Sequence, residues 1–395
     1  MQYDFDTVID RHGTCSMKWS LAGSTRPGFE HVNDDTIPMM VADMDLQCPQ
    51  CVIDAMHRVA DHKIYGYSSH TAQPLYFTSL CGWFARRHGW QILPEQILPS
   101  HGTFGALTHI ANMMTREGEG ILVLDPVYGH FSQDIVKWGR QVVRCHLRLE
   151  DGRYTIDYDL LEKLASGSNN TLLIFCNPHN PVGRVWTAEE IRRVDEICRR
   201  NGVFVISDEV HCDILRRGVS YTPYLTVCGD KSKAVSMVGT NKSFNMAGLS
   251  CSNAIIQDEA LYARILKTYP MPMLSPFAIE GQAAAYSQGD EWMDQVCDYI
   301  DGNIDWAIAF FRDTMPRLKI TRPEGTYCLW MDFRAYGLSD EEVHRRIYLQ
   351  ANVLLQDGTV HDPVEGQCWQ RMCVPCARSV LETACRRIAE AFSDL

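Results

Sequence analysis

The chain has 395 residues, enough for one large enzyme domain and a smaller one, because domains commonly contain roughly 100 to 200 residues. Its composition, 46% hydrophobic and 22% charged, is that of a globular protein and excludes disorder as the main state. The formal net charge of −12 has the wrong sign for nonspecific attraction to nucleic acid or anionic membranes. We therefore expect no nucleic acid and no membrane among its partners.

Residues 104–267 alternate short apolar runs with segments of helical periodicity. Strands are predicted at 121–124, 142–147, 171–175, 203–206, 234–239 and 252–256. Helices are predicted between them at 104–114, 129–137, 188–201 and 259–267. This alternation predicts an α/β fold with a mostly parallel sheet covered by helices.

After about Met273 the pattern changes to longer helices. Helices are predicted at 277–287, 291–315 and 378–392, with short strands at 319–321 and 327–333. This predicts a large α/β domain followed by a smaller α+β domain. We expect residues 1–45 to contribute to the small domain, 46–284 to form the large ligand-binding domain and 285–395 to form the small C-terminal domain. No GxGxxG or Walker motif is present, so a nucleotide fingerprint is absent.

The N-terminus and the cysteines indicate the compartment. No apolar run approaches the roughly 18 residues of a membrane span, and the opening MQYDFDTVIDRHG is polar and acidic, unlike a signal peptide. The sixteen cysteines lie within apolar stretches, which favours reduced core thiols and a cytoplasmic location. Most of the chain separates the pair Cys48/Cys51 from Cys373/Cys376, so we expect no metal site. Incidental thiols are the preferred interpretation, with a redox thiolate at Cys48, near a predicted helix start, as the alternative.

Polar side chains follow three of the predicted strands, where open α/β sheets bind ligands. Asn180 lies in the turn CNPHNPVG, and Asp208 ends the next strand, where a buried carboxylate requires a cationic partner. Lys242 follows the strand 234–239, where desolvation lowers the pKa of an amine and makes it a nucleophile.

In this order, Asn180, Asp208 and Lys242 resemble the pyridoxal 5'-phosphate (PLP) site of fold-type I aminotransferases, and the resemblance extends over nearly the whole chain. It implies an aminotransferase fold type I. It also implies that the aspartate pairs with the pyridine nitrogen, the asparagine bonds the phenolic oxygen and the lysine forms the Schiff base.

Several stretches narrow the resemblance to the cystathionine β-lyase, or carbon–sulfur lyase, branch of the maltose-regulon modulator type. They read DRHGT from Asp10, MMVADMD from Met39, YGYS from Tyr65, SDEVH from Ser207 and KSFN from Lys242. Two positions depart from the aspartate aminotransferase pattern, because His211 replaces a tyrosine and Ser250 replaces a phosphate-binding arginine. The phosphate must therefore be held by other groups.

The same resemblance, with the affinity of helix N-termini for phosphate, implies the remaining cofactor contacts. Backbone amides of Thr103 and Phe104 and the hydroxyl of Thr240 are expected at the phosphate. Tyr128 matches the aromatic residue that stacks on the pyridine ring and is also a catalytic candidate. Tyr67 matches a residue that reaches the phosphate of the neighbouring subunit, which implies a homodimer with shared active sites.

The resemblance also implies the substrate contacts. Arg371 matches the arginine whose planar fork holds the α-carboxylate of an amino-acid substrate. Asn180 and Ala42 are expected to contact the substrate together with Arg371. His211 is expected to contact the cofactor.

Three functions remain open. A PLP-dependent carbon–sulfur β-lyase, releasing thiol, pyruvate and ammonia, is the preferred prediction. An amino-acid aminotransferase uses the same residues and is the second. A regulatory protein that contacts a protein partner, with secondary lyase activity, is the third.

Overall fold

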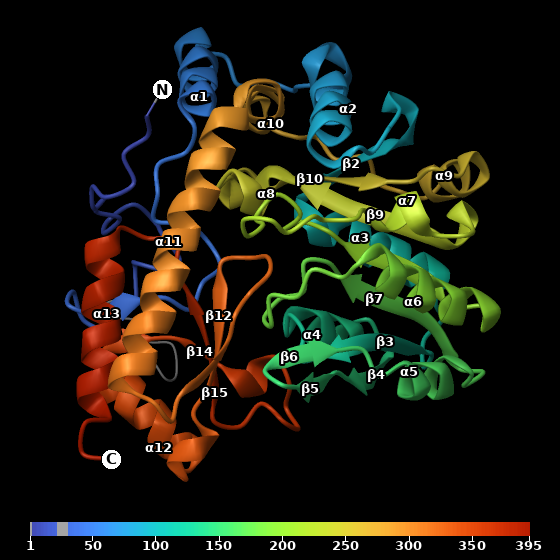
Figure 1. Cartoon of the computed structure of the whole chain (residues 1–395). Coiled ribbons are helices and arrows are strands. Elements are labelled where there is room, and N and C mark those ends of the chain that lie inside the picture. The colour runs from blue at the N-terminus through green and yellow to red at the C-terminus, as the bar shows by residue number, and fades with distance from the viewer. Residues whose placement is uncertain (1, 22–30) are drawn as a thin grey trace.

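The structure is a computed structural model, and it describes residues 2–21 and 31–395. A seven-stranded sheet forms its centre, in the order β2-β10-β9-β8-β7-β3-β4 (Figure 1). The strands are β2 (Ile97–His101), β10 (Cys251–Ile255), β9 (Ala234–Gly239), β8 (Phe204–Asp208), β7 (Asn170–Cys176), β3 (Gly120–Asp125) and β4 (Gln141–His146). Strand β10 runs antiparallel to both of its neighbours, β2 and β9, and the other strand pairs of this sheet are parallel. The predicted α/β fold class is confirmed.

Helices surround this sheet and bury apolar faces against it. They are α3 (Gly102–Met114), α4 (His130–Lys137), α5 (Tyr158–Ala165), α6 (Ala188–Arg200), α7 (Tyr224–Val227), α8 (Thr240–Ser243) and α9 (Glu259–Leu266). In α6, the capping box of Thr187 and Glu190 satisfies the first amides, and Ile191 and Val194 are fully buried. The capping signal and the apolar spacing together explain why this segment is helical.

The C-terminal third forms a second layered unit (Figure 1). Its four-stranded sheet has the order β11-β12-β15-β14, with β11 (Lys319–Thr321), β12 (Cys328–Asp332), β15 (Trp369–Cys373) and β14 (Gln356–Asp357). Its helices are α11 (Asp290–Thr314), α12 (Asp340–Arg345) and α13 (Arg378–Ala391). The strand β1 (Ile37–Pro38) pairs in parallel with β13 (Val353–Leu354), so the N-terminal segment lies against this unit. The domain limits at 45 and 284 stay a prediction.

Helices α1 (Gln50–His62), α2 (Leu75–His88) and α10 (Pro276–Gln288) lie at the top of the molecule in Figure 1, and the hairpin β5 (Arg148–Glu150) and β6 (Arg153–Thr155) lies near its base. No helix of the described part of the chain is long and apolar enough to cross a membrane.

The sequence-based prediction missed several elements, among them β2 and α2, and it placed the start of one helix two residues too late. Strand β2 contains Pro99, which weakens a strand pattern, yet it pairs with β10 through all five of its residues. Helix α2 has buried aromatic residues, Trp83 and Phe84, but also Gly82 in its interior. Helix α3 begins at Gly102, two residues before the predicted start, which places Thr103 in its first turn.

Candidate active site

Three adjacent strand ends form the candidate site. Strands β7, β8 and β9 are parallel, and their register pairs Cys176 with Asp208 and Asp208 with Met237. Asn180 follows β7, Asp208 ends β8 and Lys242 follows β9 in α8. A cavity of about 150 Å³ lies at this edge of the sheet. It is lined by Ala42, Thr103, Phe104, Tyr128, Cys176, Asn180, Asp208, Val210, His211, Asn241 and Lys242.

Eight of the eleven residues predicted for the site line this cavity. The other three are Arg371, Thr240 and Tyr67. Arg371 contacts Asn180 from behind the cavity wall, Thr240 is buried two residues before Lys242, and Tyr67 is 96% exposed and lies outside it. The chemical roles assigned to all eleven residues stay predictions.

Lys242 is held by the backbone of a distant segment. Its Nζ donates a hydrogen bond to the carbonyl of Ala42 at 2.7 Å, and the same carbonyl accepts a bond from the Tyr327 hydroxyl at 2.9 Å. Burial, followed by the positive charge of Arg371, lowers the pKa of Lys242. A lowered pKa increases the fraction of neutral amine, the form that accepts a proton or acts as a nucleophile.

Asp208 is a buried carboxylate with few partners. Its Oδ1 accepts a bond from the backbone amide of Val210 at 3.2 Å. Burial raises the pKa of Asp208 to about 6, although the amide of Val210 and the charge of Lys242 act in the opposite direction. A cation placed beside this carboxylate would restore its ionised form.

His211 contributes a neutral ring to the wall of the cavity. Its imidazole packs edge-on against Tyr327, with ring centroids 5.4 Å apart. Burial, followed by the charges of Lys242 and Arg371, lowers the pKa of His211 well below its usual value. Its Nδ1 has no hydrogen-bond partner among the described residues.

Arg371 brings a buried positive charge next to the cavity. The guanidinium donates from Nη1 to Asn180 Oδ1 at 3.1 Å and from Nη2 to the carbonyl of Met40 at 2.7 Å. No carboxylate of the described residues forms an ion pair with it. A buried guanidinium bonded only to neutral groups favours an anionic ligand.

Other residues at the cavity offer neutral hydrogen-bond donors. Thr103 and Phe104 lie in the first turn of α3, where backbone amides have no helical partner. The hydroxyl of Thr240 is buried and has no partner among the described residues. Tyr128 packs against Phe104, with ring centroids 6.2 Å apart. This arrangement suits a phosphate at the helix N-terminus and an aromatic ring beside Tyr128.

Sequence reasoning missed four contributors. Cys176, Val210 and Asn241 line the cavity, and each is within four residues of a predicted site residue. Their proximity in sequence was the available signal. Tyr327 begins a predicted strand of the C-terminal unit, and nothing in the sequence indicates that it reaches Ala42.

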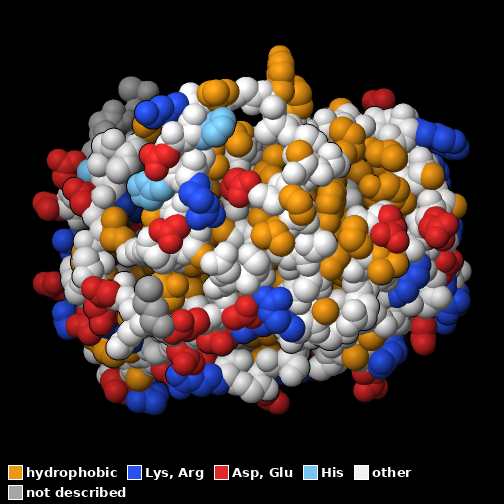
Figure 2. Space-filling model, turned by 90° about the horizontal axis from the view of Figure 1, so that it is seen from above, with side chains coloured by type: hydrophobic (Ala, Val, Ile, Leu, Met, Phe, Trp, Pro, Cys, Tyr) orange, Lys and Arg blue, Asp and Glu red, His pale blue; other side chains and the backbone are white. Residues whose placement is uncertain are grey.

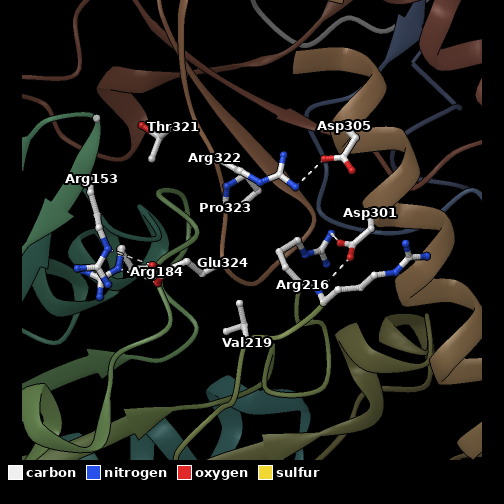
Figure 3. Close-up of a pocket in the computed structure, with 12 residues that line it drawn as sticks. Arg153, Arg184, Arg216, Val219, Asp301, Asp305, Thr321, Arg322, Pro323 and Glu324 are labelled. Carbon is white, nitrogen blue, oxygen red and sulfur yellow. Dashed lines mark hydrogen bonds and ion pairs between the residues drawn. The ribbon is translucent and has the colours of Figure 1, made fainter. Parts of the chain in front are cut away.

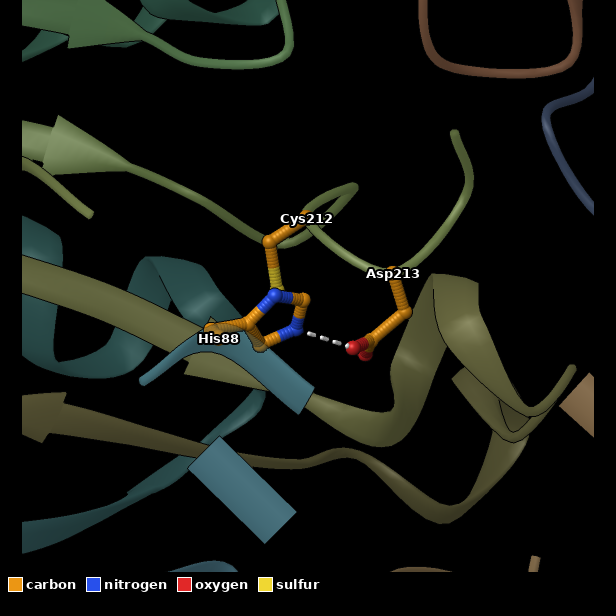
Figure 4. Close-up of side chains that lie close together, drawn as sticks. All are labelled: His88, Cys212 and Asp213. Atoms are coloured by element: carbon orange, nitrogen blue, oxygen red, sulfur yellow. Dashed lines mark hydrogen bonds and ion pairs between the residues drawn. The ribbon is translucent and has the colours of Figure 1, made fainter. Parts of the chain in front are cut away.

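A buried polar network supports the helix that carries Lys242. The carboxylate of Asp213 accepts bonds from Trp83 Nε1 at 2.8 Å and Ser243 Oγ at 2.6 Å, and His88 Nε2 lies 2.7 Å from its Oδ1. Figure 4 shows His88 and Asp213 beside Cys212, a group with metal-ligand composition. Because the carboxylate oxygens already hold these groups, the network favours positioning of Ser243 and Lys242 over metal binding.

The other group of metal-ligand composition among the described residues is equally well explained by protein contacts. Asp125 and Asp362 lie together with His146, and Arg144 forms an ion pair with Asp125. Neither CxxC pair belongs to such a group among the described residues, and all sixteen cysteines are free.

The alternative redox interpretation of Cys48 is wrong. Cys48 precedes α1 by two residues, but burial raises the pKa of its thiol to about 11. The neutral thiol is therefore the stable form at neutral pH.

Comparison with known proteins places these features in a family. The family described as aminotransferase class I and II matches residues 34–388. Cystathionine beta-lyase PatB of Bacillus subtilis is 36% identical over 99% of this chain and 100% of its own length. Protein MalY of Escherichia coli is 28% identical over 96% of both chains.

Comparison with solved structures indicates the same family. Cystalysin from Treponema denticola, which contains PLP, superposes with a TM-score of 0.93 at 30% identity, covering 100% of both chains. A PLP-bound C-S lyase from Staphylococcus hominis also has a TM-score of 0.93 at 30% identity, covering 99% of this chain and 98% of its own. The predicted fold type and lyase branch are therefore confirmed, and the chain belongs to the class I and II aminotransferase family.

Proposed function

We propose that this protein is a PLP-dependent carbon–sulfur β-lyase acting on amino acids with a thiol or thioether at Cβ. One observation carries the proposal: Asn180, Asp208 and Lys242 come from three adjacent strand ends and face one cavity of about 150 Å³. The names of the similar proteins, cystathionine beta-lyase and C-S lyase, support the same reaction class.

The residues present fit PLP. The buried carboxylate of Asp208 suits the pyridine nitrogen, and Asn180 suits the phenolic oxygen. The first-turn amides of α3 at Thr103 and Phe104, with the partnerless hydroxyl of Thr240, suit the phosphate. When bound, PLP supplies a conjugated ring that accepts the electron pair left by the broken Cα–H bond of the substrate.

The chain's own residues then bind the substrate and move its proton. Arg371 holds the α-carboxylate through its planar fork, since it is buried and has no ion-pair partner among the described residues. Lys242, with its lowered pKa, removes the Cα proton as a general base. The carbonyl of Ala42, 2.7 Å from Nζ, holds the amine in place before reaction.

The overall reaction consumes one water. Loss of the Cα proton is followed by cleavage of the Cβ–S bond, and the sulfur leaves as a thiolate that takes up a proton. The remaining three-carbon unit is hydrolysed to pyruvate and ammonia.

The test compares elimination with amino transfer. Purified holoenzyme is incubated with cystathionine or cysteine, with and without a 2-oxo acid, and pyruvate, thiol and new amino acid are measured. We expect stoichiometric pyruvate and thiol that do not depend on the 2-oxo acid. Amino transfer without pyruvate would assign the protein to the aminotransferases.

We further propose a homodimer in which Tyr67 reaches the site of the partner subunit. Hydrophobic side chains gather on the face seen from above, over α1, α2 and α10 (Figure 2). The exposed hydrophobic residues include Ile64 and Tyr65, which precede Tyr67 in sequence, and Met271 and Met273. Met273 is next to Leu274, whose carbonyl accepts a bond from Ser68 Oγ at 2.5 Å. A hollow of about 520 Å³ beside Tyr67 and Pro276 adds to this surface. An apolar surface of this kind favours burial against a second copy.

Mixing two inactive variants tests the shared site. If Tyr67 acts across the interface, Tyr67→Ala and Lys242→Ala dimers recover activity after subunit exchange, because one site of the hybrid has both residues. Absence of recovery in hybrids verified by native mass spectrometry contradicts the shared site. A regulatory protein partner and a cytoplasmic location stay predictions.

A further inference from the structure

A second cavity, of about 400 Å³, lies outside the proposed active site between the two units of the chain (Figure 3). Its wall contains five arginines and three carboxylates. The charged residues are Arg153, Arg184, Arg216, Arg217, Arg322, Asp301, Asp305 and Glu324. A cavity of this size accommodates a small metabolite. Nothing in the proposed reaction uses it.

Arg216 is the most unusual of these residues. Its side chain is only 5% exposed, and Nη1 lies 2.8 Å from Asp301 Oδ1. The guanidinium nitrogens, including Nε and Nη2, have no hydrogen-bond partner of acceptable geometry among the described residues. Buried donors left without acceptors are costly, so an acceptor entering the cavity would gain strong charge-assisted bonds.

The neighbouring arginines differ in how firmly they are held. Glu324 accepts from Arg184 at 2.8 Å and from Arg153 at 3.1 Å, and both contacts involve the same carboxylate. Arg322 pairs with Asp305 at 2.6 Å, but both side chains are more than half exposed. An exposed pair contributes little and exchanges readily, so Arg322 is free to turn toward a ligand.

We propose that this cavity binds a small molecule with two anionic groups, carboxylate or phosphate in chemistry. Arg216 holds one group through Nε and Nη2, which have no hydrogen-bond partner among the described residues. Arg322 holds the other group at the rim, in exchange for Asp305. A ligand with a single anionic group would leave most of the 400 Å³ unfilled and would not contact both Arg216 and Arg322.

The backbone around the cavity links it to the proposed active site. Arg216 N donates to the carbonyl of Glu324 at 2.9 Å, and Glu324 N donates to the carbonyl of Gly183 at 2.7 Å. These segments continue into His211, Tyr327 and Asn180 of the first site. The anion site therefore lies behind the walls of that site, although its existence does not depend on the proposed reaction.

Calorimetric titration of the holoenzyme with pyrophosphate and with citrate tests the proposal at about 0.15 M salt, where weak surface attraction is screened. We expect saturable binding of at least one probe with one site per chain. Arg216→Gln should weaken it by about tenfold or more, and Arg322→Gln by about threefold to tenfold. Arg386→Gln is the matched control, because it also removes one arginine from an ion pair, with Glu382, but lies outside the cavity.

The probes also distinguish the ligand chemistry, since pyrophosphate alone indicates a phosphorylated ligand and citrate alone a polycarboxylate. If Arg216→Gln fails to fold, the exposed Arg322→Gln and the charge-reversed Arg322→Glu carry the test, and neither threatens the core. The proposal is overturned if neither probe binds the wild type, or if binding is equal in wild type, Arg322→Glu and Arg386→Gln.

Discussion

Replacement of Asp208 by asparagine should make the cofactor-free protein more stable and the enzyme inactive. The substitution keeps the shape of the side chain and removes its ability to ionise. Burial raises the pKa of Asp208 from 3.8 to about 6, so the folded protein resists formation of the buried charge. A shift of roughly two units corresponds to about 3 kcal/mol at pH values above both pKa values.

The direction of this stability difference follows from the number of protons that the folded and unfolded chains bind. Below about pH 4 the carboxyl is protonated in the folded and unfolded chains, and the variant gains nothing. Between about pH 4 and 6 the unfolded chain releases this proton while the folded chain keeps it, so a rising pH destabilises the wild type. Above about pH 6 the Asp208 carboxyl is ionised in the folded chain as well, and the full difference in the free energy of unfolding between wild type and variant persists.

Chemical denaturation of cofactor-free wild type and Asp208→Asn at pH 4 and pH 7 measures this effect. We expect the difference in the free energy of unfolding to grow by about 3 kcal/mol in favour of the variant. In the holoenzyme, by contrast, the substitution should be harmful. Turnover of Asp208→Asn should be lower than that of the wild type by about two orders of magnitude, since the pyridine nitrogen loses its counter-charge. A difference that does not change with pH would refute the desolvation of Asp208, and near wild-type turnover would refute its role.

Three further predictions concern other parts of the site. Lys242→Ala should abolish the visible absorption of the bound cofactor and lower turnover by several orders of magnitude; an unchanged spectrum and rate would remove Lys242 from the mechanism. Arg371→Ala should raise KM by about 100-fold, equivalent to roughly 3 kcal/mol, with a smaller change in kcat; steady-state kinetics with an unchanged KM would place the carboxylate elsewhere. Asp213→Asn should lower the free energy of unfolding by about 3 kcal/mol and reduce kcat more than it raises KM, because Ser243 loses its anchor beside Lys242. Full activity in a destabilised Asp213→Asn protein would limit that network to a structural role.

Much of the architecture was readable from the sequence because its signals are local. Apolar runs of four to six residues predicted β3, β7, β8, β9 and β10, and each strand end that bears a polar residue was identifiable. In a parallel sheet the carboxyl ends of adjacent strands meet at one edge, so the sequence alone groups Asn180, Asp208 and Lys242. The family resemblance then supplied the expected cofactor.

The tertiary structure decided what depends on contacts between distant segments. The carbonyl of Ala42 receives bonds from Lys242 and Tyr327, residues separated from it by most of the chain, and no local pattern encodes that meeting. Burial is equally nonlocal. Burial keeps the Cys48 thiol neutral, although its place before a helix made it a candidate thiolate. Burial also leaves Nε and Nη2 of Arg216 without a hydrogen-bond partner among the described residues, in a cavity that no sequence motif indicates. Desolvation depends on the folded surroundings rather than on sequence neighbours.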